Sequence, residues 1–189
     1  MDVIVLAGGQ SSRMGHNKLR APVGGVALLD RVLLAVRDAQ RVVVVGQPVP
    51  TVYPVSWTIE QPAGAGPLAG IGAGLAYLDS QQPPVQDSDR VLVIAGDLPL
   101  AEQAIDALQK SSAEESVVVA TDDEGHQQVL LSLWPTMLLR DQLQRAEPLA
   151  NRPARLLLKD CVAQTVEVGR AATDVDTPED LAAIQKLIP

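Results

Sequence analysis

Residues 4–18 read Ile-Val-Leu-Ala-Gly-Gly-Gln-Ser-Ser-Arg-Met-Gly-His-Asn-Lys: an apolar run, two glycines, and then a polar, basic loop. Residues 3–6 have the apolar character of a strand buried in a sheet. Glycines let the backbone approach a ligand closely and expose N–H groups that can bind phosphate oxygens. Arg13, Lys18 and Arg20 add positive charge to a chain whose formal net charge is −8. The stretch therefore predicts a nucleotide triphosphate site at the carboxyl end of a first β-strand.

The composition is that of one globular unit. With 189 residues, 47% of them hydrophobic, we expect a single domain over residues 1–189. Phe is absent and Trp and Tyr number two each, so we expect an aliphatic core without an aromatic platform for nucleic acid bases. The negative charge also disfavours binding to a phosphate backbone. The composition therefore predicts that nucleic acid is not a partner.

The cysteine count and the hydropathy pattern point to a compartment. Cys161 is the single cysteine and cannot form an internal disulfide, which favours a reducing cytoplasm. No apolar run approaches the roughly 18 residues of a membrane span. We expect a cytoplasmic protein that does not bind membranes.

Apolar runs typical of buried strands alternate with helical patterns through the first two thirds of the chain. The expected strands are residues 3–6, 41–46, 55–59, 91–95 and 116–121, and the expected helices are residues 27–39, 67–78 and 101–111. Such alternation predicts an α/β fold with a parallel sheet covered on both faces.

The pattern changes after residue 122. Residues 128–134 are expected to return as an antiparallel strand, followed by the helices 136–144 and 153–159, the strand 162–168 and the helix 178–187. The predicted sheet is therefore mostly parallel, with an antiparallel addition in the second half.

A carboxylate follows the predicted strand 91–95, in the sequence Gly96-Asp97-Leu98-Pro99. Ligands of open α/β sheets bind beyond the carboxyl ends of the strands, so Asp97 should lie at the same edge as the glycine loop. Mg²⁺ is commonly held by one or two carboxylates together with substrate phosphates. Asp97 is thus a candidate Mg²⁺ ligand, and the alternative is a cap or turn residue before the helix 101–111.

Two further segments carry polar groups in patterns that suggest a site. Residues 60–71 form a glycine-rich loop that leads into a helix N-terminus, which can bind anions or present N–H groups to a base. The alternative for Gly70, Gly72 and Gly74 is close packing of a helix on the sheet. Residues 174–181 read Asp-Val-Asp-Thr-Pro-Glu-Asp-Leu, a helix start that is nearly a capping box.

Four segments of this chain resemble the MobA-like nucleotidyltransferase family. The opening signature of that family is commonly L-A-G-G-x-S-x-R-M-G-x-[DN]-K, and residues 6–18 fit neither the Walker A pattern nor the G-x-G-x-x-G fingerprint. The family carries G/C-D-x-P at the place of residues 96–99. Residues 60–71 are similar to its glycine-rich loop that ends in G-P-L-A-G, and residues 174–181 to its late [ND]-x-[ND]-T-P-E-[DE]-L motif. The four occur in the family's order and span nearly the whole chain.

The resemblance implies a Rossmann-like three-layer sandwich and a set of site residues. Catalysis would fall to Arg13, Lys18 and Asp97, and Mg²⁺ would be held by Asp97 and Asp176, with Asp174 as the alternative to Asp176. Acceptor contacts are expected from His126 and Gln128, which lie where relatives approach the acceptor. From its local pattern, Arg152 is either a contact to an acidic acceptor or part of a solvated helix start. The residues implied to bind the nucleotide are Leu6, Ala7, Gly8, Gly9, Ser11, Ser12, Arg13, Lys18, Glu60, Gln61, Gly66, Pro67, Leu68 and Ala69.

The resemblance also implies a reaction, in which an acceptor phosphate attacks the α-phosphorus of a nucleoside triphosphate and pyrophosphate leaves. The leading expectation is transfer of GMP from GTP to the phosphate of molybdenum–molybdopterin. The alternatives are the cytidylyl branch of the family, another phosphate acceptor, or a nucleotide-binding regulatory module without activity. Gln61 departs from the family, because a carboxylate at that position would accept the N1–H and N2–H₂ groups of guanine more strongly than an amide.

Overall fold

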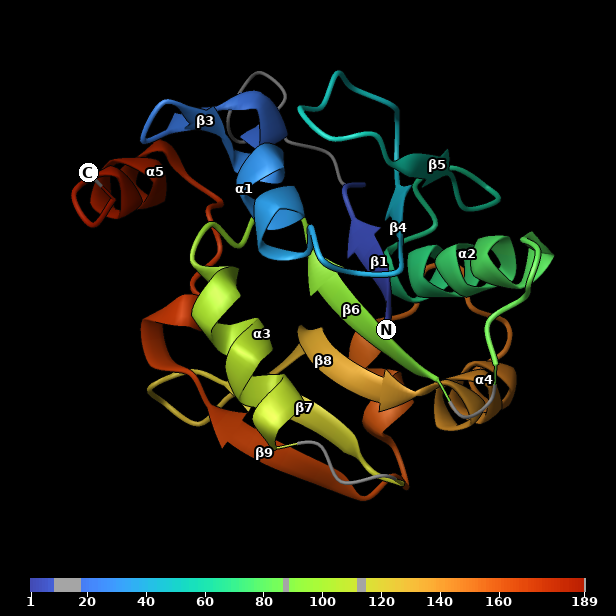
Figure 1. Cartoon of the computed structure of the whole chain (residues 1–189). Coiled ribbons are helices and arrows are strands. Elements are labelled where there is room, and N and C mark those ends of the chain that lie inside the picture. Colours follow the sequence, from blue (N-terminus) through green and yellow to red (C-terminus); the bar gives the residue numbers. More distant parts are fainter. Residues whose placement is uncertain (9–17, 87–88, 112–114, 189) are drawn as a thin grey trace.

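The computed structural model describes residues 1–8, 18–86, 89–111 and 115–188 of the chain. Its main feature is a seven-stranded sheet of order β5-β4-β1-β6-β8-β7-β9, shown in Figure 1. The strands are β1 (Asp2–Leu6), β4 (Arg41–Val45), β5 (Ser56–Thr58), β6 (Arg90–Ala95), β7 (Val117–Thr121), β8 (Gln127–Pro135) and β9 (Ala163–Glu167).

The direction of the strands agrees with the sequence-based expectation. β1 pairs in parallel with β4 and β6, and β4 pairs in parallel with β5. β8 runs antiparallel to β6 and to β7, while β7 and β9 are parallel. The antiparallel addition is therefore the single strand β8, inserted in the middle of the sheet.

Helices cover both faces of the sheet, as Figure 1 shows. α1 (Leu28–Ala35) and α3 (Ala101–Lys110) share one buried cluster with Val3 and Val5 of β1. α2 (Pro67–Ser80) and α4 (Thr136–Arg145) share the other cluster with Ile4. Because alternate side chains of β1 enter opposite clusters, the strand is apolar throughout, and the molecule is the expected three-layer α/β sandwich.

α2 lies close against the central strands because it contains glycines where it faces them. A Cβ on Gly74 would stand 2.5 Å from Cγ2 of Ile4, and one on Gly70 would stand 3.1 Å from Cδ2 of Leu6. A Cβ on Gly72 would stand 2.6 Å from Cδ1 of Leu149. Packing of the helix on the sheet is therefore confirmed for Gly70 and Gly74, whereas Gly72 packs against Leu143 of α4 and Leu149 beyond it.

The C-terminal helix packs away from the sheet. α5 (Pro178–Gln185) lies beside a small hairpin of β2 (Pro22–Val23) and β3 (Val26–Ala27). Val23, Leu28, Val175 and Ile184 form a third buried cluster between them. This contact holds the segment before α5 at the edge of the sheet where the strands β1 and β6 end.

Some boundaries differ from expectation. The predicted helix 27–39 ends at Ala35 in α1, and the predicted helix 153–159 is the 3-10 helix η2 (Ala154–Leu158). Two further 3-10 helices, η1 (Lys18–Arg20) and η3 (Gly169–Ala172), and the β2–β3 hairpin were not expected. Within the described ranges, no helix has the length and apolar character needed to cross a membrane.

Candidate functional site

A lysine joins two carboxylates at the edge of the sheet. Nζ of Lys18 lies 2.6 Å from Oδ2 of Asp97 and 2.6 Å from Oδ1 of Asp176. Lys18 begins η1, Asp97 follows β6, and Asp176 precedes α5, so three distant segments meet at one cation. The side chains of Lys18 and Asp97 are 17% and 16% exposed, whereas that of Asp176 is 51% exposed. We call these three residues the charged cluster.

The turn before α5 positions Asp176. Thr177 is the N-cap of α5 and forms a capping box with Asp180. Oδ2 of Asp180 accepts hydrogen bonds from the backbone N–H groups of Asp176, at 3.1 Å, and Thr177, at 2.8 Å. The N–H of Val175 donates to the carbonyl oxygen of Asp97 at 3.2 Å. The late motif is therefore both a helix cap and a support that holds Asp176 against the loop of Asp97.

Asp97 does not cap the following helix. Leu100 occupies the N-cap position of α3, with no side-chain capping bond. The cap interpretation of Asp97 is therefore wrong, and its carboxylate has no structural partner of that kind. The geometry leaves Asp97 available for chemistry at the sheet edge.

The charges of the cluster shift two pKa values. Burial lowers the pKa of Lys18, but its hydrogen bonds to Asp176 and Asp97 outweigh this effect, so that the pKa lies above 10.5. Asp174 lies beside the cluster, and partial desolvation of its carboxyl, followed by the charges of Asp176 and Asp97, raises its pKa. Lys18 is thus positively charged at neutral pH. Burial and the negative charges of Asp176 and Asp97 disfavour ionisation of Asp174.

The carboxylates have the chemistry expected of a Mg²⁺ site. Oδ1 of Asp97 is buried and has no hydrogen-bond partner among the residues that the structure describes. An unpaired buried carboxylate oxygen is costly, and a hard cation is one partner that satisfies it. The described residues contain no group of three or more potential metal-binding side chains. Two carboxylates such as Asp97 and Asp176 could hold Mg²⁺ only together with ligands from substrate phosphates and water.

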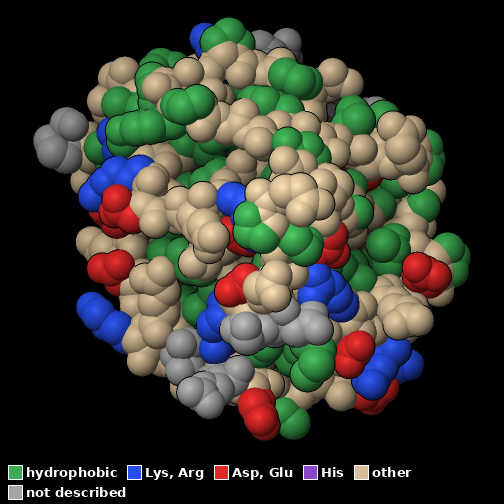
Figure 2. All heavy atoms as spheres, turned by 45° about the vertical axis from the view of Figure 1, so that its right-hand side comes forward, with side chains coloured by type: hydrophobic (Ala, Val, Ile, Leu, Met, Phe, Trp, Pro, Cys, Tyr) green, Lys and Arg blue, Asp and Glu red, His purple; other side chains and the backbone are tan. Residues whose placement is uncertain are grey.

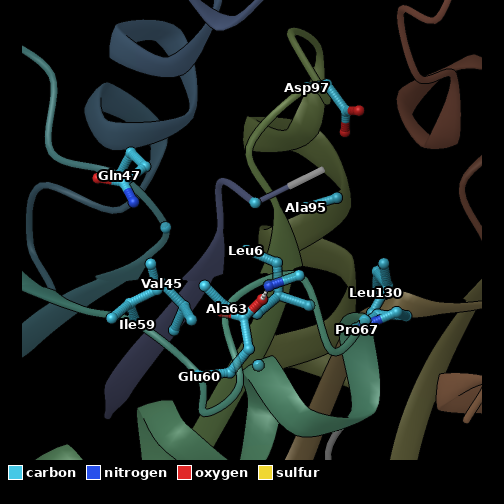
Figure 3. A pocket seen from close by; sticks show the side chains of 15 residues that line it. Leu6, Val45, Gln47, Ile59, Glu60, Ala63, Pro67, Ala95, Asp97 and Leu130 are labelled. Carbon is cyan, nitrogen blue, oxygen red and sulfur yellow. Dashed lines mark hydrogen bonds between the residues drawn. The ribbon is translucent and has the colours of Figure 1, made fainter. Parts of the chain in front are cut away.

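A cavity of about 500 Å³ adjoins Asp97 (Figure 3). Figure 3 shows Glu60 and Asp97 on different sides of it. The wall between them is mostly apolar side chain and glycine backbone. The lining residues are Leu6, Gly8, Val45, Gly46, Gln47, Ile59, Glu60, Ala63, Gly64, Gly66, Pro67, Gly70, Ala95, Asp97 and Leu130. The cavity joins the first glycine loop, the second glycine loop and the end of β6.

The structure places five of the ten expected nucleotide-binding residues that it describes in the wall of this cavity. Leu6, Gly8, Glu60, Gly66 and Pro67 line it. The remaining five do not line it: Ala7, Lys18, Gln61, Leu68 and Ala69. Ala7 donates its N–H to the carbonyl of Val45, Leu68 and Ala69 are buried in α2, and Gln61 is exposed and lies outside the lining.

Some expected residues lie outside the described part of the chain, and some lining residues were not expected. Gly9, Ser11, Ser12 and Arg13 fall in the segment 9–17, which the structure does not describe. Gly46 and Gln47 line the cavity but were not predicted. They directly follow β4, so their place at the end of a parallel strand was the signal that could have identified them.

The expected acceptor residues lie in two places. Asp122, in the β7–β8 turn, accepts hydrogen bonds from the backbone of His126 and from Nε2 of Gln128. Arg152 donates to the carbonyl of Ala146, and its own carbonyl oxygen would be 4.0 Å from a Cβ on Gly66. The backbone of Arg152 therefore lies beside the second glycine loop, whereas His126 lies in the turn before β8 and Gln128 lies in β8 itself.

The surface around α2 and α4 has mixed charge. On the side of the molecule seen in Figure 2, the Lys and Arg side chains drawn in colour stand among Asp and Glu side chains and hydrophobic ones. This distribution agrees with the net charge of −8.

Comparison with known proteins identifies relatives over nearly the full length. A molybdenum cofactor guanylyltransferase of Rhizobium meliloti is 28% identical over 203 residues, covering 98% of this chain and 91% of the relative. A probable molybdenum cofactor guanylyltransferase of Mycolicibacterium paratuberculosis is 30% identical over 190 residues, covering 96% and 93%. The crystal structure of molybdopterin-guanine dinucleotide biosynthesis protein A from Archaeoglobus fulgidus shares the fold, with a TM-score of 0.75 at 21% identity and coverage of 99% and 98%.

The family match covers the strands that build the site. The MobA-like NTP transferase domain matches residues 3–167, which include both glycine loops and Asp97. Asp176 lies beyond the matched range, yet the structure joins it to Lys18 inside that range. By sequence and by fold, the chain belongs to the MobA-like NTP transferase family.

Proposed function

We propose that this nucleotidyltransferase transfers GMP from GTP to the phosphate of molybdenum–molybdopterin and releases pyrophosphate. The observation that carries the proposal is the charged cluster at one end of the 500 Å³ cavity, which offers places for a nucleoside and for its phosphates. The names of the full-length relatives supply the identity of base and acceptor.

The reaction needs positioning and charge more than covalent participation of the protein. An oxygen of the acceptor phosphate forms a bond to the α-phosphorus, and the bond from that phosphorus to the bridging oxygen of the β-phosphate breaks. Pyrophosphate leaves with the electron pair. The acceptor supplies the nucleophile, so the protein contributes by aligning two anionic groups and neutralising charge on the leaving group.

Lys18 is the described cation best placed for this task. Its ammonium group has three donors, and two of them now bind Asp97 and Asp176. Both carboxylates belong to the same site, so an entering triphosphate meets a lysine that is already desolvated and fixed. We expect Lys18 to donate to phosphate oxygens, with Arg13 as a second cation from the glycine loop.

Asp97 and Asp176 would hold Mg²⁺. The orphaned Oδ1 of Asp97 and the carboxylate chemistry of both residues fit that ion. When bound, the metal would supply neutralising charge for the triphosphate. Lys18 pairs with the same two carboxylates, so it would stand beside the ion and the substrate phosphates.

The acceptor should approach from the side of the second glycine loop. The backbone carbonyl of Arg152 lies beside Gly66, and Nη1 of its guanidinium donates to the carbonyl of Ala146. The guanidinium would have to leave that bond to meet an acceptor phosphate in a two-pronged contact. We propose Arg152 as the principal acceptor contact. His126 and Gln128 are weaker candidates because Asp122 holds the backbone of His126 and the side chain of Gln128.

The test is pyrophosphate release by the purified protein with Mg²⁺ and GTP, CTP, ATP or UTP, each with and without molybdopterin cofactor. We expect release with GTP that requires the cofactor, and loss of that release in Asp97→Ala. Release with CTP in place of GTP would move the protein to the cytidylyl branch. Triphosphate binding without release in any mixture would indicate another acceptor or a binding module.

A further inference from the structure

We propose that Glu60, and not its neighbour Gln61, selects guanine in this protein. The inference rests on the proposed function, since it assigns the base preference of the same site. The sequence pattern alone directed attention to position 61. The structure instead places Gln61 on the exposed surface and Glu60 in the cavity wall.

Glu60 is a buried carboxylate in a defined position. The residue is 7% exposed, and its Oε1 accepts the backbone N–H of Gly64 at 2.9 Å. The same oxygen would lie 3.9 Å from a Cβ on Gly8, so it stands close to the backbone of the first glycine loop. The bond from Gly64 thus fixes the carboxylate of Glu60 within its own loop, the second glycine loop. In this position the carboxylate also lies close to Gly8 of the first glycine loop.

The surroundings of Glu60 favour a ligand that brings hydrogen-bond donors. The neighbouring wall is formed by apolar side chains, among them Leu6, Val45 and Ile59. A carboxylate has about four lone-pair positions, and the bond from Gly64 occupies one of them. Burial of such a group is costly unless the remaining positions find donors. A ligand that enters the cavity is therefore selected for N–H groups that face Glu60.

Guanine matches this requirement better than the other bases. Its N1–H and N2–H₂ groups point in the same direction and can both donate to one carboxylate. Cytosine and adenine present an amino group beside a ring nitrogen that is itself an acceptor, and uracil presents one N–H between two carbonyl oxygens. These acceptors would face the negative charge of Glu60. Because Glu60 and Asp97 lie on different sides of the cavity (Figure 3), a base at Glu60 leaves its phosphates directed toward the charged cluster.

The experiment is equilibrium binding of GTP, CTP and ATP, with Mg²⁺ present, to the intact protein and to two variants. Glu60→Gln keeps the size of the side chain and an oxygen that can accept from Gly64, but replaces the charge with an amide. Gln61→Ala is the matched control at the neighbouring exposed position. A thermal unfolding curve of each variant verifies that the fold is retained.

We expect the preference of the unmodified protein for GTP over CTP to fall about 10- to 100-fold in Glu60→Gln, as loss of hydrogen bonds to a charged group implies. Gln61→Ala should leave that preference within about threefold. An unchanged preference in Glu60→Gln, or a collapse of the preference in Gln61→Ala, would overturn the assignment.

Inosine triphosphate provides a second readout that needs no variant. It lacks the 2-amino group, so the unmodified protein should bind it several-fold more weakly than GTP, and equal affinity would contradict pairing of both donors with Glu60. Failure of the unmodified protein to bind any triphosphate would count against the proposed function itself. Tight binding of GTP, CTP, ATP and inosine triphosphate without preference would instead refute only the role of Glu60.

Discussion

Replacing Lys18 with Met removes the cation of the charged cluster while it keeps an unbranched side chain. The variant leaves Asp97, whose Oδ1 already has no partner among the described residues, without its ion pair as well. Breaking a buried pair costs about 3–5 kcal/mol, and an exposed pair contributes about 0–1 kcal/mol. The Lys18–Asp97 pair is mostly buried and Asp176 is half exposed, so we expect a loss of about 2–3 kcal/mol.

The loss should be visible in equilibrium unfolding by urea and in a melting temperature lower by roughly 5–10 °C. Because the pKa of Lys18 is raised above 10.5, its stabilising effect is complete below that pH and disappears as the pH rises through the folded-state pKa. The difference between the two proteins should therefore shrink at strongly alkaline pH. Pyrophosphate release should fall about 10²–10³-fold, as for removal of one charge-stabilising donor.

Two controls separate the charged cluster from a general effect of losing a lysine. Lys110→Met, at the exposed last turn of α3, should change stability by less than about 0.5 kcal/mol. Asp97→Asn in the Lys18→Met background should recover part of the lost stability, because the unpaired charge is gone. If Lys18→Met unfolds at the same urea concentration as the unmodified protein, or if the two substitutions are additive, the reasoning about the charged cluster is refuted.

Three further substitutions test the framework of the site. Gly74→Ala brings a Cβ to within 2.5 Å of Ile4 and should lower the urea midpoint by an equivalent of about 1–2 kcal/mol, after the gain in helix propensity; a stabilised variant would contradict the packing argument. Thr177→Ala removes the capping box with Asp180 and should cost about 1 kcal/mol while raising KM for the metal-bound triphosphate; unchanged stability would exclude the cap. Asp174→Asn should raise the melting temperature at neutral pH, because the raised pKa means that ionisation of Asp174 opposes folding; the gain should vanish below about pH 3.8, and a loss at neutral pH would reverse the assignment.

The parallel core of the sheet was predictable because strands that are buried on both faces consist of nearly continuous apolar residues. The segments that became β1, β4 and β6 are short apolar runs between helical patterns, and such runs have few alternatives to a central strand. The β2–β3 hairpin escaped prediction because its strands have two residues each, too few to show alternation. The predicted helix 27–39 was too long because apolar residues continue to Ala39 after the helix ends at Ala35.

The sequence predicted several residues of the site, but it did not predict which of them contact one another. Motifs at strand ends placed Lys18 and Asp97 at one edge, since parallel strands share their carboxyl edge. That Asp176 reaches Lys18 depends on the packing of α5 on the hairpin, a contact between residues 158 apart in the chain. Which of Glu60 and Gln61 faces the cavity depends on the path of the loop, and neighbouring residues carry no periodic signal there. The sequence pattern favoured Gln61 for the base, whereas the geometry favours Glu60.

Transfer of the nucleotide to the acceptor is tested by following the α-phosphate of GTP. The protein is incubated with Mg²⁺, molybdopterin cofactor and GTP that carries a label on its α-phosphorus, and the products are separated. We expect the label to move to a product containing molybdopterin while unlabelled pyrophosphate is released, and we expect Asp97→Ala to abolish the transfer. Label that stays in GTP, or that appears as free GMP with the cofactor unchanged, would contradict the claim that this cavity and its charged cluster join a nucleotide to a phosphate acceptor.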